Sequence, residues 1–131
     1  MRIGRDANMR IAICDDDKAD LHALQNAVSI FDQCGTLDIC AFSSAAELYK
    51  SEMAQNFHIA ILDIEMPPPN GYDIAKRLVE TGSAPIIIFL TNSMSYTLRG
   101  YGIAFRYLTK PIDQTQLNNA LSAAVKECSA K

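Results

Sequence analysis

The sequence lacks the features that would place it in several broad classes of protein. No apolar run approaches the roughly 18 residues of a membrane span, and residues 1–9 are polar, without the apolar segment of a signal peptide. The four cysteines show no C-x-x-C spacing, which favours reduced, structural thiols. The net charge is −3 and no block rich in Lys or Arg occurs, which argues against direct contact with nucleic acid. We therefore predict a cytoplasmic protein that contacts neither membranes nor nucleic acid.

Sequence motifs of several enzyme classes are absent as well. The segment 100–105 lacks the third glycine and the preceding strand of a dinucleotide-binding loop. No P-loop and no G-x-S-x-G motif occurs. The two histidines, His22 and His58, do not have metal-binding spacing, and we interpret both as surface or boundary residues.

The length and composition fit one domain with one core. With 131 residues, 49% of them hydrophobic, the chain can bury enough surface to fold without a disulfide or a structural metal. Residues 1–8 are polar and precede the first apolar run, so we predict a flexible N-terminal extension there. Residues 9–131 then form the domain.

Five short apolar runs predict β-strands. Three of them contain nearly continuous hydrophobic residues (IAIC, IAIL and IIIFL), which is typical of strands covered on both faces in a parallel sheet. Helices are therefore expected on both sides of that sheet. The predicted strands are residues 10–14, 37–42, 58–63, 85–90 and 105–108.

The segments between and after these runs carry apolar residues at helical spacing and predict five helices. Ser44 and Asp113 each stand three positions before an acid or amide, as residues at helix starts do. The third helix is predicted over 71–79, with Ile74, Ala75, Leu78 and Val79 facing inward. The fourth, near 93–101, has a thin apolar stripe and a glycine, so we expect it to move.

This order of elements predicts an α/β fold: a single doubly wound, five-stranded parallel sheet with strand order 2-1-3-4-5, flanked by five helices. In such folds, ligands bind beyond the carboxyl ends of the strands, at the point where the strand order reverses. Here that point lies between the first and third strands.

Polar side chains stand where the predicted strands end. Carboxylates brought within a few ångströms repel one another and raise a pKa unless a cation compensates, and hard oxygen ligands favour Mg²⁺. The sequence therefore predicts a magnesium site. The side chains are Asp15, Asp16 and Asp17 after the first strand, Asp63 and Glu65 at the third, Thr91 at the fourth and Lys110 after the fifth.

These groups suit the transfer of a phosphoryl group. Asp63 can act as the nucleophile, while Lys110 supplies a compact cation and Thr91 a hydroxyl donor. Simpler interpretations exist for single residues. Asp17 fits a helix-capping role, and Tyr107, on the fifth strand, fits a core aromatic with a wet hydroxyl.

Four segments at four strand ends resemble the receiver domain of two-component response regulators. They are ICDDD at 13–17, LDIEMPPPNG at 62–71, FLTN at 89–92 and YLTKP at 107–111. The stretch AFRYLTKPI at 104–112 is similar to receivers that precede LytTR-type DNA-binding domains. The run of three prolines at 67–69 departs from the commonest receiver pattern and stiffens the loop, and we expect Gly71 beyond it to take a turn conformation.

The resemblance implies a role for each acidic residue. Asp63 would be phosphorylated by a sensor histidine kinase. Asp15 and Asp16 would bind Mg²⁺ directly or through water together with Asp63, and the backbone carbonyl of Glu65 would complete the metal shell.

The resemblance also implies a switch. Thr91 would be the switch hydroxyl, Tyr107 the switch aromatic and Lys110 the phosphate-contacting lysine, followed by a cis bond to Pro111. Phosphorylation would draw Thr91 toward Asp63, Tyr107 would rotate, and the face formed by the fourth helix, fifth strand and fifth helix would change. Homodimerisation through that face is a further expectation of the resemblance.

We therefore predict a phosphorylation-controlled signalling switch, not an enzyme beyond its own phosphotransfer and slow autodephosphorylation. Its output would be a DNA-binding domain absent from this chain or, alternatively, protein contacts of a stand-alone receiver. A magnesium-dependent phosphohydrolase is disfavoured, because Glu65 stands where such enzymes commonly carry an acid/base aspartate. A receiver-like module that works without phosphate is a third hypothesis.

Overall fold

The structure, a computed structural model, describes residues 9–52, 56–81, 84–92 and 102–129, which contain five strands and four helices. Among these residues, no helix is long and apolar enough to cross a membrane. The elements are β1 (Met9–Cys14), α1 (Lys18–Phe31), β2 (Leu37–Phe42), α2 (Ala45–Glu52), β3 (Ile59–Asp63), α3 (Gly71–Glu80), β4 (Ile86–Thr91), β5 (Ala104–Thr109) and α4 (Gln114–Ser129).

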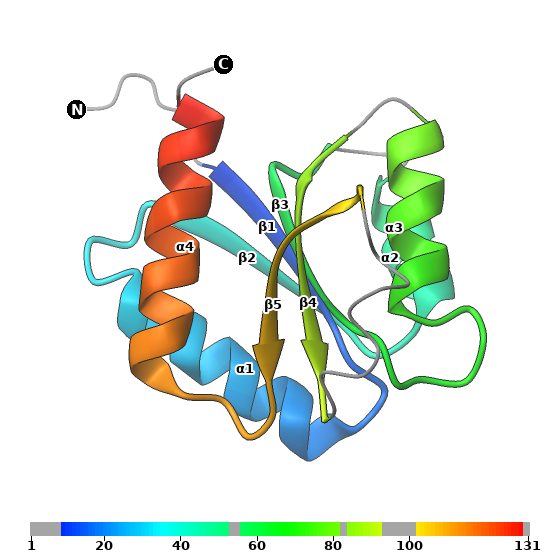
Figure 1. The fold of residues 1–131 in the computed structure, drawn as a ribbon, viewed down its shortest axis with the longest axis horizontal. Helices are drawn as coiled ribbons and strands as arrows, with labels where there is room; N and C mark the ends of the chain where they lie inside the picture. Colours follow the sequence, from blue (N-terminus) through cyan, green and yellow to red (C-terminus); the bar gives the residue numbers. More distant parts are fainter. Residues whose placement is uncertain (1–8, 53–55, 82–83, 93–101, 130–131) are drawn as a thin grey trace.

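The strands form one parallel sheet in the order β2-β1-β3-β4-β5 (Figure 1). Every residue of β3 and β4 is buried, whereas the outer strands β2 and β5 are mostly half-buried. The continuous apolar runs therefore occupy the centre of the sheet, where helices cover both faces. The predicted fold class and strand order are confirmed.

Helices α1 and α4 cover one face of the sheet, and α2 and α3 cover the other (Figure 1). Successive side chains of a strand point to opposite faces, so each central strand contributes to two cores. Ile11 and Ile13 of β1 pack on the α1/α4 side, whereas Ala12 and Cys14 pack on the α2/α3 side. All four cysteines lie in the described part of the chain, and they form no disulfide there.

Side-chain caps fix where the helices begin. Ser44 Oγ accepts a hydrogen bond from the backbone of Glu47, and Asp113 Oδ1 accepts one from the backbone of Gln116. Both predicted helix starts are thereby confirmed. Asp17 caps α1 by accepting from the backbone N–H three residues later, as its simpler interpretation predicted.

The third helix corrects one predicted inward residue. Val79 is 43% exposed, because the buried stripe of α3 runs through Gly71, Ile74, Ala75 and Leu78 at spacings of three and four. Val79 follows that stripe by one residue and turns toward solvent. The fourth predicted helix, near 93–101, and the predicted extension 1–8 lie outside the described residues.

Candidate functional site

The predicted site residues meet at the carboxyl edge of the sheet. Asp15 follows β1, Asp63 and Thr91 are the last residues of β3 and β4, and Lys110 follows β5. Strand β1 lies between β2 and β3, so the strand order reverses at the end of β1, next to Asp15. Segments separated by up to 95 residues along the chain therefore supply one site.

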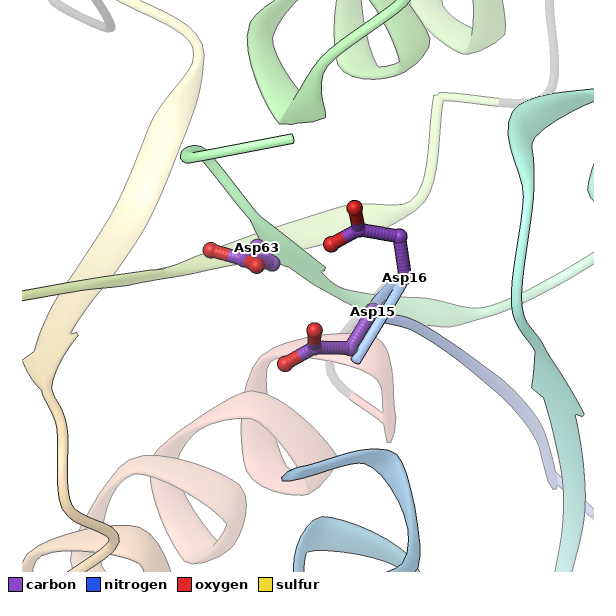
Figure 2. A group of neighbouring side chains, drawn as sticks. All are labelled: Asp15, Asp16 and Asp63. Carbon is purple, nitrogen blue, oxygen red and sulfur yellow. The ribbon is translucent and has the colours of Figure 1, made fainter. Parts of the chain in front are cut away.

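Three carboxylates gather at this edge, as Figure 2 shows. Asp15, Asp16 and Asp63 each offer an oxygen, and these oxygens lie within 4.8 Å of one another. Asp15 and Asp63 are 1% and 2% exposed, whereas Asp16 is open to solvent. Two buried acids beside a third favour a bound cation, and a set of oxygen ligands at least partly open to water suits Mg²⁺.

Lys110 is the cation that the structure places among these acids. Its Nζ donates to Asp15 Oδ2 at 2.8 Å, to Asp20 Oδ2 at 2.9 Å and to Asp63 Oδ2 at 3.3 Å. Burial acts to lower the pKa of Lys110, but the hydrogen bonds that Nζ donates to Asp15 and Asp20 outweigh it and hold the pKa above its ordinary value. The side chain is therefore a charged ammonium at neutral pH.

Asp63 has an elevated pKa of about 6. Burial is the largest cause and raises the pKa, the backbone N–H of Glu65 opposes it, and the charge of Asp15 raises it further. The ammonium of Lys110 lowers the pKa of Asp63 again. Asp63 is thus mostly ionised at neutral pH, but its pKa lies close enough to neutral pH for neighbouring charges to change its protonation.

The local backbone orients both buried acids in the same way. Asp15 Oδ1 accepts a hydrogen bond from the N–H of Asp17 at 3.0 Å, and Asp63 Oδ1 accepts one from the N–H of Glu65 at 3.0 Å. Each acid therefore binds the backbone two residues ahead with one oxygen and Lys110 with the other. This arrangement fixes the rotamers of both side chains before any ligand binds.

The start of α3 packs directly against the end of β3. A Cβ atom added to Gly71 would lie 2.6 Å from the carbonyl oxygen of Asp63, which is closer than real contacts allow. Gly71 is the first residue of α3 and therefore helical, so the expected turn conformation is wrong. The glycine is needed for close approach of two backbones.

Glu65 makes a contact that the sequence did not predict. Its side-chain Oε1 accepts a hydrogen bond from the backbone N–H of Asn92 at 2.7 Å. The loop after β3 is thereby tied to the residue that follows β4. The metal-binding role of the Glu65 backbone carbonyl stays a prediction.

Thr91 and Tyr107 lie on the same face of neighbouring strands. Thr91 is fully buried and pairs in register with Thr109, two residues after Tyr107. Tyr107 is half-buried, and its ring lies 5.6 Å from that of Phe89, centroid to centroid. The predicted switch residues thus border the same α2/α3 core.

Sequence reasoning missed Asp20, the second acid on Lys110. It lies in the first turn of α1, 90 residues before the lysine, and the only signal was an additional acid soon after the three aspartates. His58, in contrast, has the boundary role that was predicted. Its Nδ1 accepts a hydrogen bond from the backbone of Arg10, while His22 is exposed.

Two bonds before proline are cis in this part of the molecule. The bond between Lys110 and Pro111 is cis, as the resemblance implied, and the bond between Pro68 and Pro69 is cis as well. The latter lies in the exposed loop that separates Glu65 from α3.

Comparison with known proteins identifies the class. The family model of the response regulator receiver domain matches residues 11–122. Sensory transduction protein LytT of Enterococcus faecalis is 28% identical over 120 residues, which cover 91% of this chain and 49% of the relative. LytT of Bacillus subtilis is 30% identical over 106 residues, which cover 80% of this chain and 36% of the relative.

A solved structure supports the same assignment. The BeF3-activated receiver domain of DrrB, an OmpR/PhoB homologue from Thermotoga maritima, has a TM-score of 0.75 at 27% identity and covers 92% of this chain and 99% of that one. The chain belongs to the response regulator receiver domain family, whose members are signalling domains of two-component systems. The LytT relatives confirm the predicted likeness to LytTR-type regulators. The chain spans about half the length of these relatives or less.

Proposed function

We propose that Asp63 accepts a phosphoryl group from a sensor histidine kinase in a Mg²⁺-dependent reaction. The observation that supports this most directly is the buried Asp63 carboxylate, held beside Asp15 and within reach of the Lys110 ammonium. A nucleophile, a cation and further acids for a metal occupy one edge of the sheet. The proposal depends on this combination of residues and not on any one of them.

The donor set fits Mg²⁺. Asp15, Asp16 and Asp63 would hold the ion together with the backbone carbonyl of Glu65, and Asp16, being exposed, leaves room for water ligands. When bound, Mg²⁺ supplies positive charge that offsets the negative charge of the acids and of a phosphoryl group.

In the reaction, a carboxylate oxygen of Asp63 forms a bond to phosphorus while the bond from phosphorus to the donor's imidazole nitrogen breaks. The imidazole leaves with the bonding electron pair and takes up a proton. The product is an acyl phosphate. Lys110 contacts the new phosphoryl oxygens as a point charge, because its ammonium already lies 3.3 Å from Asp63.

The switch that follows would use Thr91 and Tyr107. The phosphoryl group adds charge and acceptor oxygens, which the Thr91 hydroxyl can satisfy by moving toward Asp63. Tyr107, which lies on the same face, would then rotate into the vacated space. We expect the surface of β5 and α4 to change as a result.

The output is proposed to be a DNA-binding domain beyond this chain. The support is the likeness to LytT proteins that are at least twice as long as the aligned segment. The alternative is a stand-alone receiver that acts through protein contacts. With either output, a homodimer formed on phosphorylation through the β5/α4 surface is a further part of the proposal.

Intact mass measurement after treatment with acetyl phosphate and Mg²⁺ tests the proposal. We expect the mass of one phosphoryl group, sensitive to hydroxylamine as an acyl phosphate is, with the modified peptide containing Asp63. The variant Asp63→Asn should take no label, whereas the control Asp17→Asn, at an exposed aspartate, should be labelled. Full labelling of Asp63→Asn would assign the acceptor to another residue. Steady turnover of a small phosphate ester would favour the phosphohydrolase.

A further inference from the structure

The ammonium of Lys110 has three hydrogens and three carboxylate partners. Two of these partners, Asp15 and Asp63, are buried members of the acid cluster. The third, Asp20, comes from the first turn of α1 and does not belong to that cluster. Its side chain is 48% exposed, whereas that of Lys110 is 11% exposed. Asp20 therefore binds the lysine from the solvent side.

We propose that Asp20 is a positioning residue that restrains Lys110 and slows phosphoryl transfer to Asp63. The inference rests on the proposed function. A phosphoryl oxygen on Asp63 needs an N–H of Lys110, and all three N–H groups are engaged in the structure. One of these bonds must therefore be released or shared before the lysine can contact the phosphoryl group.

The exposed bond is the one that can be released at least cost. Asp15 is 1% exposed, so removing its cation would leave a buried charge without compensation. Asp20 can return to water instead. The ion pair between Asp20 and Lys110 is thus the contact that competes with the incoming group.

The charge of Asp20 acts in the same direction. Its carboxylate and that of Asp63 bind the same ammonium, at 2.9 Å and 3.3 Å, so Asp20 places a negative charge close to the attacking oxygen. That charge repels an anionic phosphoryl donor and offsets part of the charge of Lys110. Asp15 still holds the lysine at 2.8 Å when Asp20 is neutral, so the lysine keeps its place.

The test compares rates of labelling by acetyl phosphate with Mg²⁺ in the wild type, in Asp20→Asn and in Asp20→Ser. An exposed ion pair of ordinary strength predicts about a two- to five-fold faster reaction in both variants. The gain should shrink at about 1 M salt, because salt screens exposed charges. Asp17→Asn is the matched control: it removes the same charge from the same turn and keeps a good N-cap, so its rate should stay close to that of the wild type.

A second measurement checks the contact itself without Mg²⁺. The NMR signal of the Lys110 ammonium should shift in Asp20→Asn and stay in place in Asp17→Asn, because Nζ donates a hydrogen bond to Asp20 Oδ2. An unchanged or slower labelling rate in both Asp20 variants overturns the inference, as does an equal gain in Asp17→Asn. Failure of the wild type to become labelled at Asp63 would instead overturn the proposed function.

Discussion

Asp15 and Asp63 are held by the same pattern of bonds, although 48 residues separate them along the chain. Each gives one carboxylate oxygen to the backbone N–H two residues ahead, and each gives the other oxygen to Lys110. The lysine therefore compensates two buried charges at once. The stability of this edge of the sheet depends on that single ammonium.

Lys110→Met should destabilise the protein by about 3 kcal/mol, because removing one partner of a buried ion pair leaves the other without compensation. Urea unfolding at pH 8 without Mg²⁺ measures this change in the free energy of unfolding. Lys126→Ala, at an exposed lysine of α4, should change it by less than about 0.5 kcal/mol. A loss in Lys110→Met no larger than in the control would show that the acids are compensated in another way.

The elevated pKa of Asp63 predicts how stability varies with pH. The pKa is about 6 in the folded protein, against 3.8 for an unperturbed aspartate in the unfolded chain, so the folded state binds the proton more tightly. Protonated Asp63 therefore contributes to stability below about pH 4, and this contribution is lost as the pH rises through about 6. The difference between the two pKa values corresponds to a loss of about 3 kcal/mol in the free energy of unfolding.

Asp63→Asn removes this dependence. The free energy of unfolding of the wild type minus that of Asp63→Asn should therefore fall between about pH 4 and pH 7, measured by urea unfolding without Mg²⁺. A difference that is constant over this range would contradict the elevated pKa. Asp17→Asn, at an exposed cap, is the control for loss of one charge.

Mg²⁺ should stabilise the wild type by about 1.4 kcal/mol at ten times its dissociation constant, because a ligand that binds only the folded state shifts the equilibrium. Asp16→Asn should lose most of this gain, since Asp16 is one of the three clustered acids, yet fold normally because it is exposed. Thermal unfolding with and without Mg²⁺ measures both values. Retention of the full gain in Asp16→Asn would exclude this residue from the metal site.

Gly71→Ala should destabilise the protein by about 1–3 kcal/mol, although alanine is the better helix former. The added Cβ would lie 2.6 Å from the carbonyl oxygen of Asp63, so β3 and α3 must separate. Lys76→Ala, at an exposed position of the same helix, should have almost no effect on urea unfolding. Equal stability of Gly71→Ala and the wild type would show that the two backbones can separate freely.

Local sequence patterns were enough to predict the sheet and most of the site. The runs IAIC, IAIL and IIIFL identify buried central strands, and in a parallel sheet the residues that follow such strands meet at one edge. Asp15, Asp63, Thr91 and Lys110 could therefore be placed together from their positions alone. Topology, and not the details of packing, brings them to that edge.

The remaining features depend on distances between elements that no local pattern encodes. Asp20 reaches Lys110 because α1 begins beside the loop after β5, and an acid in a first helical turn ordinarily faces solvent. Gly71 is required because α3 begins against Asp63, which the sequence of the loop does not reveal. The spacing of apolar residues predicts an inward Val79, but such spacing does not show how far a helix turns away from its sheet, and Val79 is exposed.

The Glu65 side chain gives a final test between the receiver and the phosphohydrolase. Its carboxylate accepts a hydrogen bond from the backbone N–H of Asn92 at 2.7 Å, which gives this side chain the role of a structural tether. Glu65→Gln keeps an acceptor oxygen but cannot act as an acid or base, whereas Glu65→Ala removes the acceptor.

Labelling of Asp63 by acetyl phosphate should therefore be nearly unchanged in Glu65→Gln. In Glu65→Ala, hydrogen exchange of the Asn92 amide should become about five-fold faster, as expected for the loss of about 1 kcal/mol from one hydrogen bond. If Glu65 were the acid/base group of a hydrolase, both variants would instead lose turnover of a phosphate ester to the same extent. The Gln variant separates the two roles because it preserves the geometry and removes only the titrating group.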